Sequence, residues 1–167
     1  MAEGYRAYRA ACPNCGAPVE FASSASAFAV CGFCRSTLVR EGDALRRIGQ
    51  SAELFDDHSP LQLGATGKAN GSAFTLVGRL QYRYKDGTWN EWHALFGGGD
   101  AAQKSGWLSE DNGRYVIAFD AALDAAAPAP TSLQAGAQLI VNGQSWSVAS
   151  VSAAKLVAAQ GELPYKP

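Results

Sequence analysis

The clearest pattern along the chain is an alternation of apolar and polar residues from Phe74 to Tyr84. Such a period of two is typical of a half-buried β-strand. The pair Asp86-Gly87 then predicts a two-residue turn, after which a second strand returns over residues 88–96. The pattern therefore predicts an antiparallel hairpin in which Lys85 stands opposite Thr88.

This register places Glu91 and His93 on the apolar face of the hairpin, opposite Tyr82 and Leu80. A carboxylate and an imidazole among aromatic rings could form a general acid–base pair with shifted pKa values. The alternative is a hydrogen-bonded polar pair without a catalytic role. Tyr82, Glu91 and His93 are thus a candidate buried polar site for binding or hydrolysing a small molecule.

The opposite face of the hairpin carries Arg79, Arg83 and Lys85 around Trp92. Cationic side chains beside an indole could form a platform for a nucleic-acid base, an anionic ligand or a partner protein. The alternative is a solvated outer face on which Trp92 is covered by a neighbouring strand. These four residues are the candidate ligand or partner surface.

Further short strands are expected on both sides of this hairpin, separated by turns such as the acidic stretch at 56–60 and Asn142-Gly143. A loop is expected at 97–104, and the alanine- and proline-rich stretch at 120–130 predicts a linker. The expected strands cover 47–54, 61–64, 106–110, 114–119, 139–141, 144–151 and 153–159. Many short strands at this spacing predict a mainly β fold, a small antiparallel β-barrel or sandwich.

All four cysteines lie near the N-terminus in two matched C-x-x-C pairs, Cys12 with Cys15 and Cys31 with Cys34. Two such pairs at this separation offer four sulfur ligands to a tetrahedral Zn²⁺ ion. Disulfides or a redox-active C-x-x-C are the alternatives. Since the protein would supply every ligand, no coordination position stays open, and a structural role is expected for the zinc.

Short strands expected at 18–21, 27–30 and 36–40 surround the cysteines in the order typical of a zinc ribbon. The chain is therefore expected to divide into a zinc ribbon at 1–41 and a β-rich domain at 45–167. Zinc ribbons dock on proteins or on nucleic acids, and the small excess of arginine over acid in this region is a weak sign of nucleic-acid binding. Docking on a protein is the favoured interpretation.

The composition of the 167-residue chain narrows its setting further. The formal net charge of −1 gives no general attraction to nucleic acid or to anionic membranes. The sequence contains no apolar run of transmembrane length and no signal-peptide pattern. Paired thiols without a secretion signal predict a cytoplasmic protein. With two histidines and all cysteines assigned to zinc, little material is left for a nucleophilic triad.

Several blocks of the sequence resemble a known family. They are Cys-Pro-Asn-Cys-Gly-Ala-Pro at 12–18, Ser-Pro-Leu-Gln-Leu-Gly at 59–64, Trp-Asn-Glu-Trp at 89–92, Gly-Trp-Leu-Ser-Glu at 106–110 and Gly-Glu-Leu-Pro at 161–164. Together they resemble the bacterial domain of unknown function 4178, whose members commonly carry an N-terminal zinc ribbon. The resemblance implies a setting of envelope stress, near membrane-remodelling proteins and polyamine enzymes, and no established activity. Because family members are often longer, we expect this chain to be a fragment.

The leading hypothesis is a non-enzymatic, zinc-binding adaptor or scaffold that works with protein partners, with any membrane association made through those partners. The alternatives are a nucleic-acid-binding zinc-ribbon module that uses Arg79, Arg83, Lys85 and Trp92, and a small-molecule-binding or hydrolytic domain centred on Glu91 and His93.

Overall fold

The computed structural model describes residues 8–97 and 103–167, and these residues form antiparallel β-strands, one short 3₁₀ turn (η1, Pro130–Ser132) and no α-helix. The mainly β fold expected from the sequence is confirmed. Most of the loop expected at 97–104 lies outside the described residues. The strands are β1 (Tyr8–Ala11), β2 (Pro18–Phe21), β3 (Phe28–Val30), β4 (Ser36–Glu41), β5 (Ala44–Gln50), β6 (Thr66–Ala69), β7 (Ser72–Tyr84), β8 (Gly87–Phe96), β9 (Lys104–Asp111), β10 (Arg114–Ala118), β11 (Gln138–Val141), β12 (Gln144–Ser147) and β13 (Lys155–Leu163).

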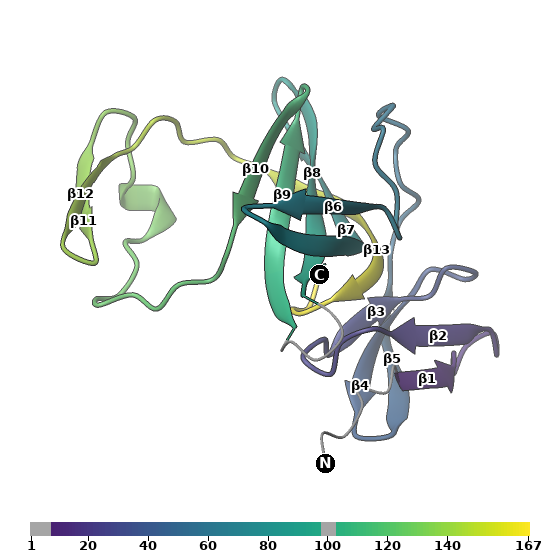
Figure 1. Cartoon of the computed structure of the whole chain (residues 1–167). Coiled ribbons are helices and arrows are strands. Elements are labelled where there is room, and N and C mark those ends of the chain that lie inside the picture. Colours follow the sequence, from purple (N-terminus) through teal and green to yellow (C-terminus); the bar gives the residue numbers. More distant parts are fainter. Residues whose placement is uncertain (1–7, 98–102) are drawn as a thin grey trace, which may run out of the picture.

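Most of these strands belong to a single large sheet with the order β10-β9-β8-β7-β13-β3-β4-β5, to which β6 is added beside β7. The C-terminal strand β13 lies between β7 and β3, so it joins the cysteine-rich N-terminal part to the rest of the chain (Figure 1). The outer strands β10 and β5 do not pair with each other, so the sheet stays open; of the two expected forms, barrel or sandwich, the closed barrel is not formed. Among the described residues, no helix is long and apolar enough to cross a bilayer.

The N-terminal part has a small core of its own, formed where β1 and β2 pair and β3, β4 and β5 form a meander. Strand β2 alternates between exposed and buried residues, which places Val19 and Phe21 inside. Ala29 and Leu38 complete the apolar cluster, and two of the cysteines are buried in it. The expected strands at 18–21, 27–30 and 36–40 are thus present, while the meander continues through β5, up to Gln50.

The β7–β8 hairpin is present, but its register differs from the expected one by two residues. The turn is formed by residues 85–86, so Arg83 stands opposite Thr88 and Tyr82 opposite Trp89. In this register the Tyr82 and Trp89 rings stack with their centroids 5.0 Å apart. From Gly78 to Tyr84 this shift leaves each side chain on its expected face but changes its cross-strand partner, so Glu91 faces Leu80 instead of Tyr82. A bulge between Leu76 and Gly78 then places Leu76 opposite Ala94, on the face of Trp92, which is the opposite of its expected face.

Two hairpins in different parts of the chain repeat one local structure. The β6–β7 hairpin turns at Asn70-Gly71 and the β11–β12 hairpin at Asn142-Gly143, with all four residues at positive φ. The strand pairings match position by position, because Phe74 stands opposite Gly67 and Trp146 stands opposite Leu139. In the first copy, Gly64 N–H donates to Leu76 O and Leu76 N–H donates to Ala65 O. The second copy has the same two main-chain bonds, from Gly136 N–H to Val148 O and from Val148 N–H to Ala137 O.

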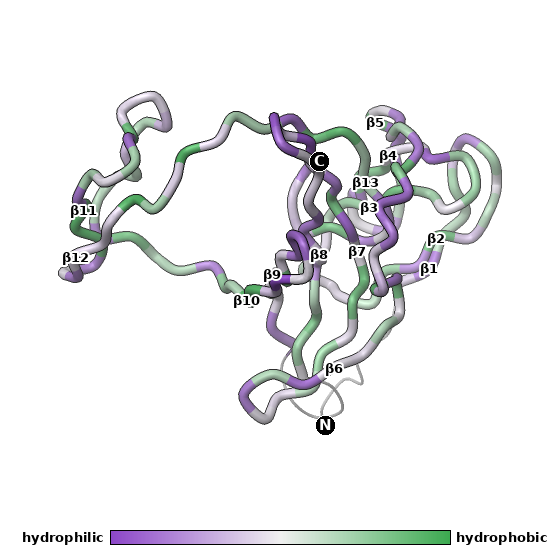
Figure 2. The backbone as a smooth tube through the Cα atoms, turned by 90° about the horizontal axis from the view of Figure 1, so that it is seen from above, coloured by the Kyte–Doolittle hydropathy of each residue, from purple (hydrophilic) through white to green (hydrophobic). Residues whose placement is uncertain are grey.

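The two copies differ in what covers them. In the first copy, Phe74 packs on Phe96 with ring centroids 5.1 Å apart, and Leu76 is 1% exposed. In the second, Trp146 occupies the position of Phe74 and is 57% exposed. The second hairpin belongs to an excursion of the chain, residues 120–154, which we call the arm and which stands apart from the large sheet (Figure 2).

Candidate functional site

The four cysteines lie on two chain reversals with the same main-chain hydrogen bonds. In the first, Gly16 N–H donates to Cys12 O at 2.8 Å; in the second, Arg35 N–H donates to Cys31 O at 2.9 Å. Gly16 and Arg35 both adopt a positive φ, which closes each reversal tightly enough to turn the second cysteine of the pair back toward the first.

The four sulfur atoms form one compact cluster, all within 4.8 Å of one another. The Sγ atoms of Cys12 and Cys34 are 3.7 Å apart, as are those of Cys15 and Cys31. A tetrahedral ion with metal–sulfur bonds of about 2.3 Å requires sulfur–sulfur distances of about 3.8 Å. The cluster therefore has the dimensions of a four-thiolate metal site, and these residues could hold a metal ion.

Two of the four thiols, Cys34 and Cys15, have pKa values shifted in opposite directions. Hydrogen bonds from Ser36 and Asn14 lower the pKa of Cys34 to about 5. The main-chain hydrogen bond from Ala17 acts in the same direction on Cys15, but burial and the neighbouring cysteines raise the pKa of Cys15 to about 12. Without a cation, four sulfurs this close cannot all become thiolates at neutral pH, and a bound cation removes that obstacle.

The residues expected to form a cationic surface do not lie together on the outside of the protein. Arg79 is 8% exposed and Trp92 is 1% exposed, whereas Arg83 and Lys85 are exposed. The guanidinium carbon of Arg79 lies 4.8 Å from the centroid of the Trp92 ring. A cation–aromatic pair is thus present, but it lies inside the protein and offers little surface to a ligand.

Arg79 belongs to a buried polar network that the sequence interpretation did not identify. Asp57 accepts two hydrogen bonds of 2.8 Å from Arg79 and one of 2.7 Å from Asn90. Burial acts to raise the pKa of Asp57, but these bonds and the charge of Arg79 hold it below its usual value. Glu110 accepts from Trp92 Nε1 at 2.9 Å and from Ser59 Oγ. Through Asp57 and Ser59, this network holds the segment before β6 against strands β7, β8 and β9.

One sequence signal could have pointed to this network. Ser59, Asn90 and Glu110 each lie in a block that carries the family resemblance, although the pattern at 56–60 by itself favours a turn. The alternation in β7 and β8 cannot reveal which of their two faces is covered. Residues 55–59 cover the polar face, where Gln81 forms hydrogen bonds with Phe55 and Arg79 pairs with Asp57. The aromatic face is half-exposed.

The structure separates the three residues of the expected Tyr82, Glu91 and His93 site. Tyr82 and Glu91 line one pocket of about 480 Å³, and His93 is not among the residues of that pocket. His93 is fully buried, with Nδ1 bonded to Glu162 O at 2.9 Å and Nε2 to Ser105 Oγ at 2.7 Å. Burial lowers the pKa of His93, so the ring is held neutral.

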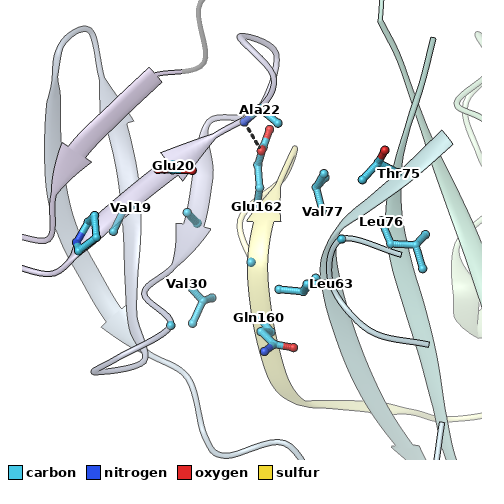
Figure 3. Close-up of a pocket in the computed structure, with 15 residues that line it drawn as sticks. Val19, Glu20, Ala22, Val30, Leu63, Thr75, Leu76, Val77, Gln160 and Glu162 are labelled. Carbon is cyan, nitrogen blue, oxygen red and sulfur yellow. Dashed lines mark hydrogen bonds between the residues drawn. The ribbon is translucent and has the colours of Figure 1, made fainter. Parts of the chain in front are cut away.

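The Gly-Glu-Leu-Pro block lies at the junction of the N-terminal part and the large sheet. The Glu162 carboxylate accepts a hydrogen bond from Ala22 N–H at 2.6 Å (Figure 3). It accepts another from Ser23 N–H at 2.9 Å. Burial raises the pKa of Glu162. Beside it lies a cleft of about 330 Å³, and Figure 3 shows Val30 of β3 and Val77 of β7 on its opposite sides. Glu162, a residue of β13, therefore binds the N-terminal part through its side-chain carboxylate.

Comparison with known proteins identifies one family. Residues 62–167 match the profile of a family described as Domain of unknown function (DUF4178). The matched region begins just before β6 and includes the strand residues of the polar network, the aromatic residues of β7, β8 and β9, and the Gly-Glu-Leu-Pro block. The four cysteines, Asp57 and Ser59 precede it. Comparison with curated proteins and with solved structures found no match.

Proposed function

The chain belongs to the DUF4178 family, and we propose that it is a non-enzymatic adaptor whose N-terminal ribbon is held together by a structural zinc ion. The observation that carries this proposal is the cluster of four sulfurs within 4.8 Å of one another. Four thiolates complete a tetrahedral shell and leave no position for water or substrate, so the ion would stabilise the fold and not activate a reactant. Thiolate ligands in tetrahedral geometry favour zinc over the harder divalent cations.

The adaptor role is supported by how the ribbon is attached. Strand β13 pairs with β3 of the ribbon on one side and with β7 on the other, so the ribbon and the strands beyond β7 present their surfaces in a defined relative position. Phe33 lies between the cysteines of the second pair and is 76% exposed. An exposed aromatic ring on a metal-stapled reversal is a rigid contact point for a protein partner.

The family resemblance favours a cytoplasmic assembly in bacterial envelope stress as the setting of this adaptor. Nucleic-acid binding has less support, because Arg79 and Trp92 are buried and the net charge is −1. Hydrolysis has less support as well, because both ring nitrogens of His93 are engaged in buried hydrogen bonds.

Native mass spectrometry of protein made in a reducing host tests the metal site. We expect one zinc ion per chain, and a mass equal to that of the bare polypeptide would refute the proposed metal site. Affinity purification of the tagged protein and of its Phe33→Ser variant tests the adaptor role. The variant should keep its zinc and lose a partner that the wild type retains; retention of every partner by the variant would contradict the assignment of Phe33.

A further inference from the structure

A second candidate site lies on the half-exposed face of β7, β8 and β9. It is the pocket of about 480 Å³ that contains Tyr82 and Glu91, and we call it the aromatic pocket. Its other aromatic side chains are Trp89, Trp107 and Tyr165, while Leu80 and Leu156 add aliphatic surface. These residues come from four different strands and from the C-terminal segment, so tertiary folding assembles the pocket.

The carboxylate of Glu91 is held in a fixed position at this pocket. Ser109 Oγ donates to it at 2.6 Å, and Trp89 Nε1 donates at 3.0 Å. None of the ion pairs formed by residues 8–97 and 103–167 involves Glu91. The half-buried carboxylate is thus oriented by neutral donors, and its charge is open to a cationic ligand.

The pocket walls suit the same kind of ligand. The faces of tryptophan and tyrosine rings carry negative electrostatic potential and attract cations placed over them. Burial and the charge of Glu91 raise the pKa of Tyr82, which shows that negative charge is disfavoured beside this carboxylate. The lining provides few hydrogen-bond acceptors besides Glu91, whereas a primary ammonium group presents three donors. A methylated ammonium group, with its charge spread over apolar methyl groups, matches such walls better.

We propose that the aromatic pocket binds a small methylated ammonium group, with Glu91 balancing its charge and the rings of Trp89, Trp107 and Tyr82 contacting its methyl groups. Lys166 also lines the pocket and forms no ion pair with Glu91. It is the one cationic side chain of the lining and would repel the incoming ligand. This proposal does not depend on the adaptor role or on the identity of the metal.

The test measures tryptophan fluorescence of the full zinc-loaded chain during titration with choline and with 3,3-dimethyl-1-butanol, its uncharged isostere. Trp89 and Trp107 lie in the pocket and report directly on its occupancy. We expect a saturable change with choline, and affinity at least about tenfold weaker for the alcohol, because only choline interacts with the carboxylate charge. Equal responses to both compounds, or no saturable response to choline, would overturn the proposal.

Variants distinguish choline binding in the aromatic pocket from binding elsewhere on the protein. Glu91→Gln keeps the shape and removes the charge, so choline affinity should fall about tenfold or more. Glu53→Gln removes an acid whose side chain is 85% exposed and does not line the pocket, and it should leave the affinity unchanged. Lys166→Gln should strengthen binding. If Glu91→Gln alters the circular dichroism spectrum, Trp107→Leu replaces it, with Trp146→Leu as its control. Unchanged affinity in a folded pocket variant refutes the site.

Discussion

Glu162 and His93 are joined by a buried hydrogen bond, from Nδ1 of the imidazole to the main-chain carbonyl oxygen, at 2.9 Å. A carbonyl oxygen can only accept, so the imidazole proton lies on Nδ1 and Nε2 accepts from the Ser105 hydroxyl. The side chain of the same glutamate binds the turn at Ala22 and Ser23. Glu162 thus contacts the large sheet through its main chain and the ribbon through its carboxylate.

The buried state of His93 predicts a loss of stability in mild acid. Its pKa is lowered by burial, so below the ordinary histidine pKa of about 6.5 the unfolded chain takes up a proton that the folded chain resists. The stabilisation is complete above that pH and is lost as the pH falls toward the folded pKa, at no more than about 1.4 kcal/mol per pH unit. Urea unfolding of the wild type and of His93→Gln from pH 7 to pH 5 should show a steeper decline in the wild type.

Two comparisons control this measurement. His58, whose side chain is 91% exposed, is the other histidine, and His58→Gln should reproduce the wild-type dependence. Glu162 has a raised pKa, so its contribution has the opposite sign: it stabilises at low pH and is lost as the pH rises through its folded pKa. Both proteins contain Glu162, so the difference between their curves isolates His93. Parallel curves would show that His93 does not titrate differently on folding.

Close contact of β7 with β13 predicts that Gly78 cannot be replaced without cost. A Cβ atom at Gly78 would overlap the carbonyl oxygen of Glu162, which the strand pairing holds in place. Gly78→Ala should therefore lower the free energy of unfolding by about 1–3 kcal/mol, as overpacking does. Gly49→Ala is the matched control, because its Cβ would meet Thr37 at an ordinary 3.9 Å. Equal unfolding midpoints for both variants would show that β7 and β13 can separate freely.

The repeated hairpin provides a test of burial at matched positions. Phe74→Ala removes a ring that packs on Phe96 and should cost about 2–4 kcal/mol. Trp146→Ala removes the larger side chain at the matching position of the arm, where it is 57% exposed, and should change stability by less than about 0.5 kcal/mol. Thermal unfolding of the two variants measures both effects. A large loss with Trp146→Ala would mean that the arm packs on other residues in solution.

Removal of the metal should affect one end of the sheet more than the other. The ribbon core contains Cys12 and Cys31 among few large apolar residues, so with the proposed zinc its folding would depend on the ion, which contributes roughly 10–16 kcal/mol in zinc-finger peptides. After chelation, hydrogen exchange should become fast in β2, β3 and β4. Strands β7, β8 and β9 have a separate core around Trp92 and should remain protected. Uniform loss of protection throughout the sheet would show that the two regions unfold together.

Local patterns in the sequence determined much of this protein. The spacing of the cysteines placed four sulfurs on two matched reversals, because a C-x-x-C reversal needs only a few residues to close. The alternation at 74–84 predicted β7, and Asn142-Gly143 predicted the turn of the arm, since both signals depend on neighbouring residues alone. The side of the hairpin on which each residue of β7 lies was also predictable from Gly78 to Tyr84, because a two-residue shift in register preserves it, but the bulge before Gly78 reverses the side of Leu76.

Only the tertiary structure decided which side became buried and what each buried group bonds to. Arg79 and Trp92 lie inside because a segment some twenty residues earlier in the chain brings Asp57 over them, and Glu110 arrives from β9. Strand β13 is inserted between β3 and β7, which are distant in sequence. Such pairings depend on contacts between remote segments, and no local pattern encodes them. For that reason the sequence predicted most strands and the sulfur cluster, although not β1 or β6, and its strand at 61–64 is absent. The aromatic pocket and the Glu162 junction emerged only from the folded chain.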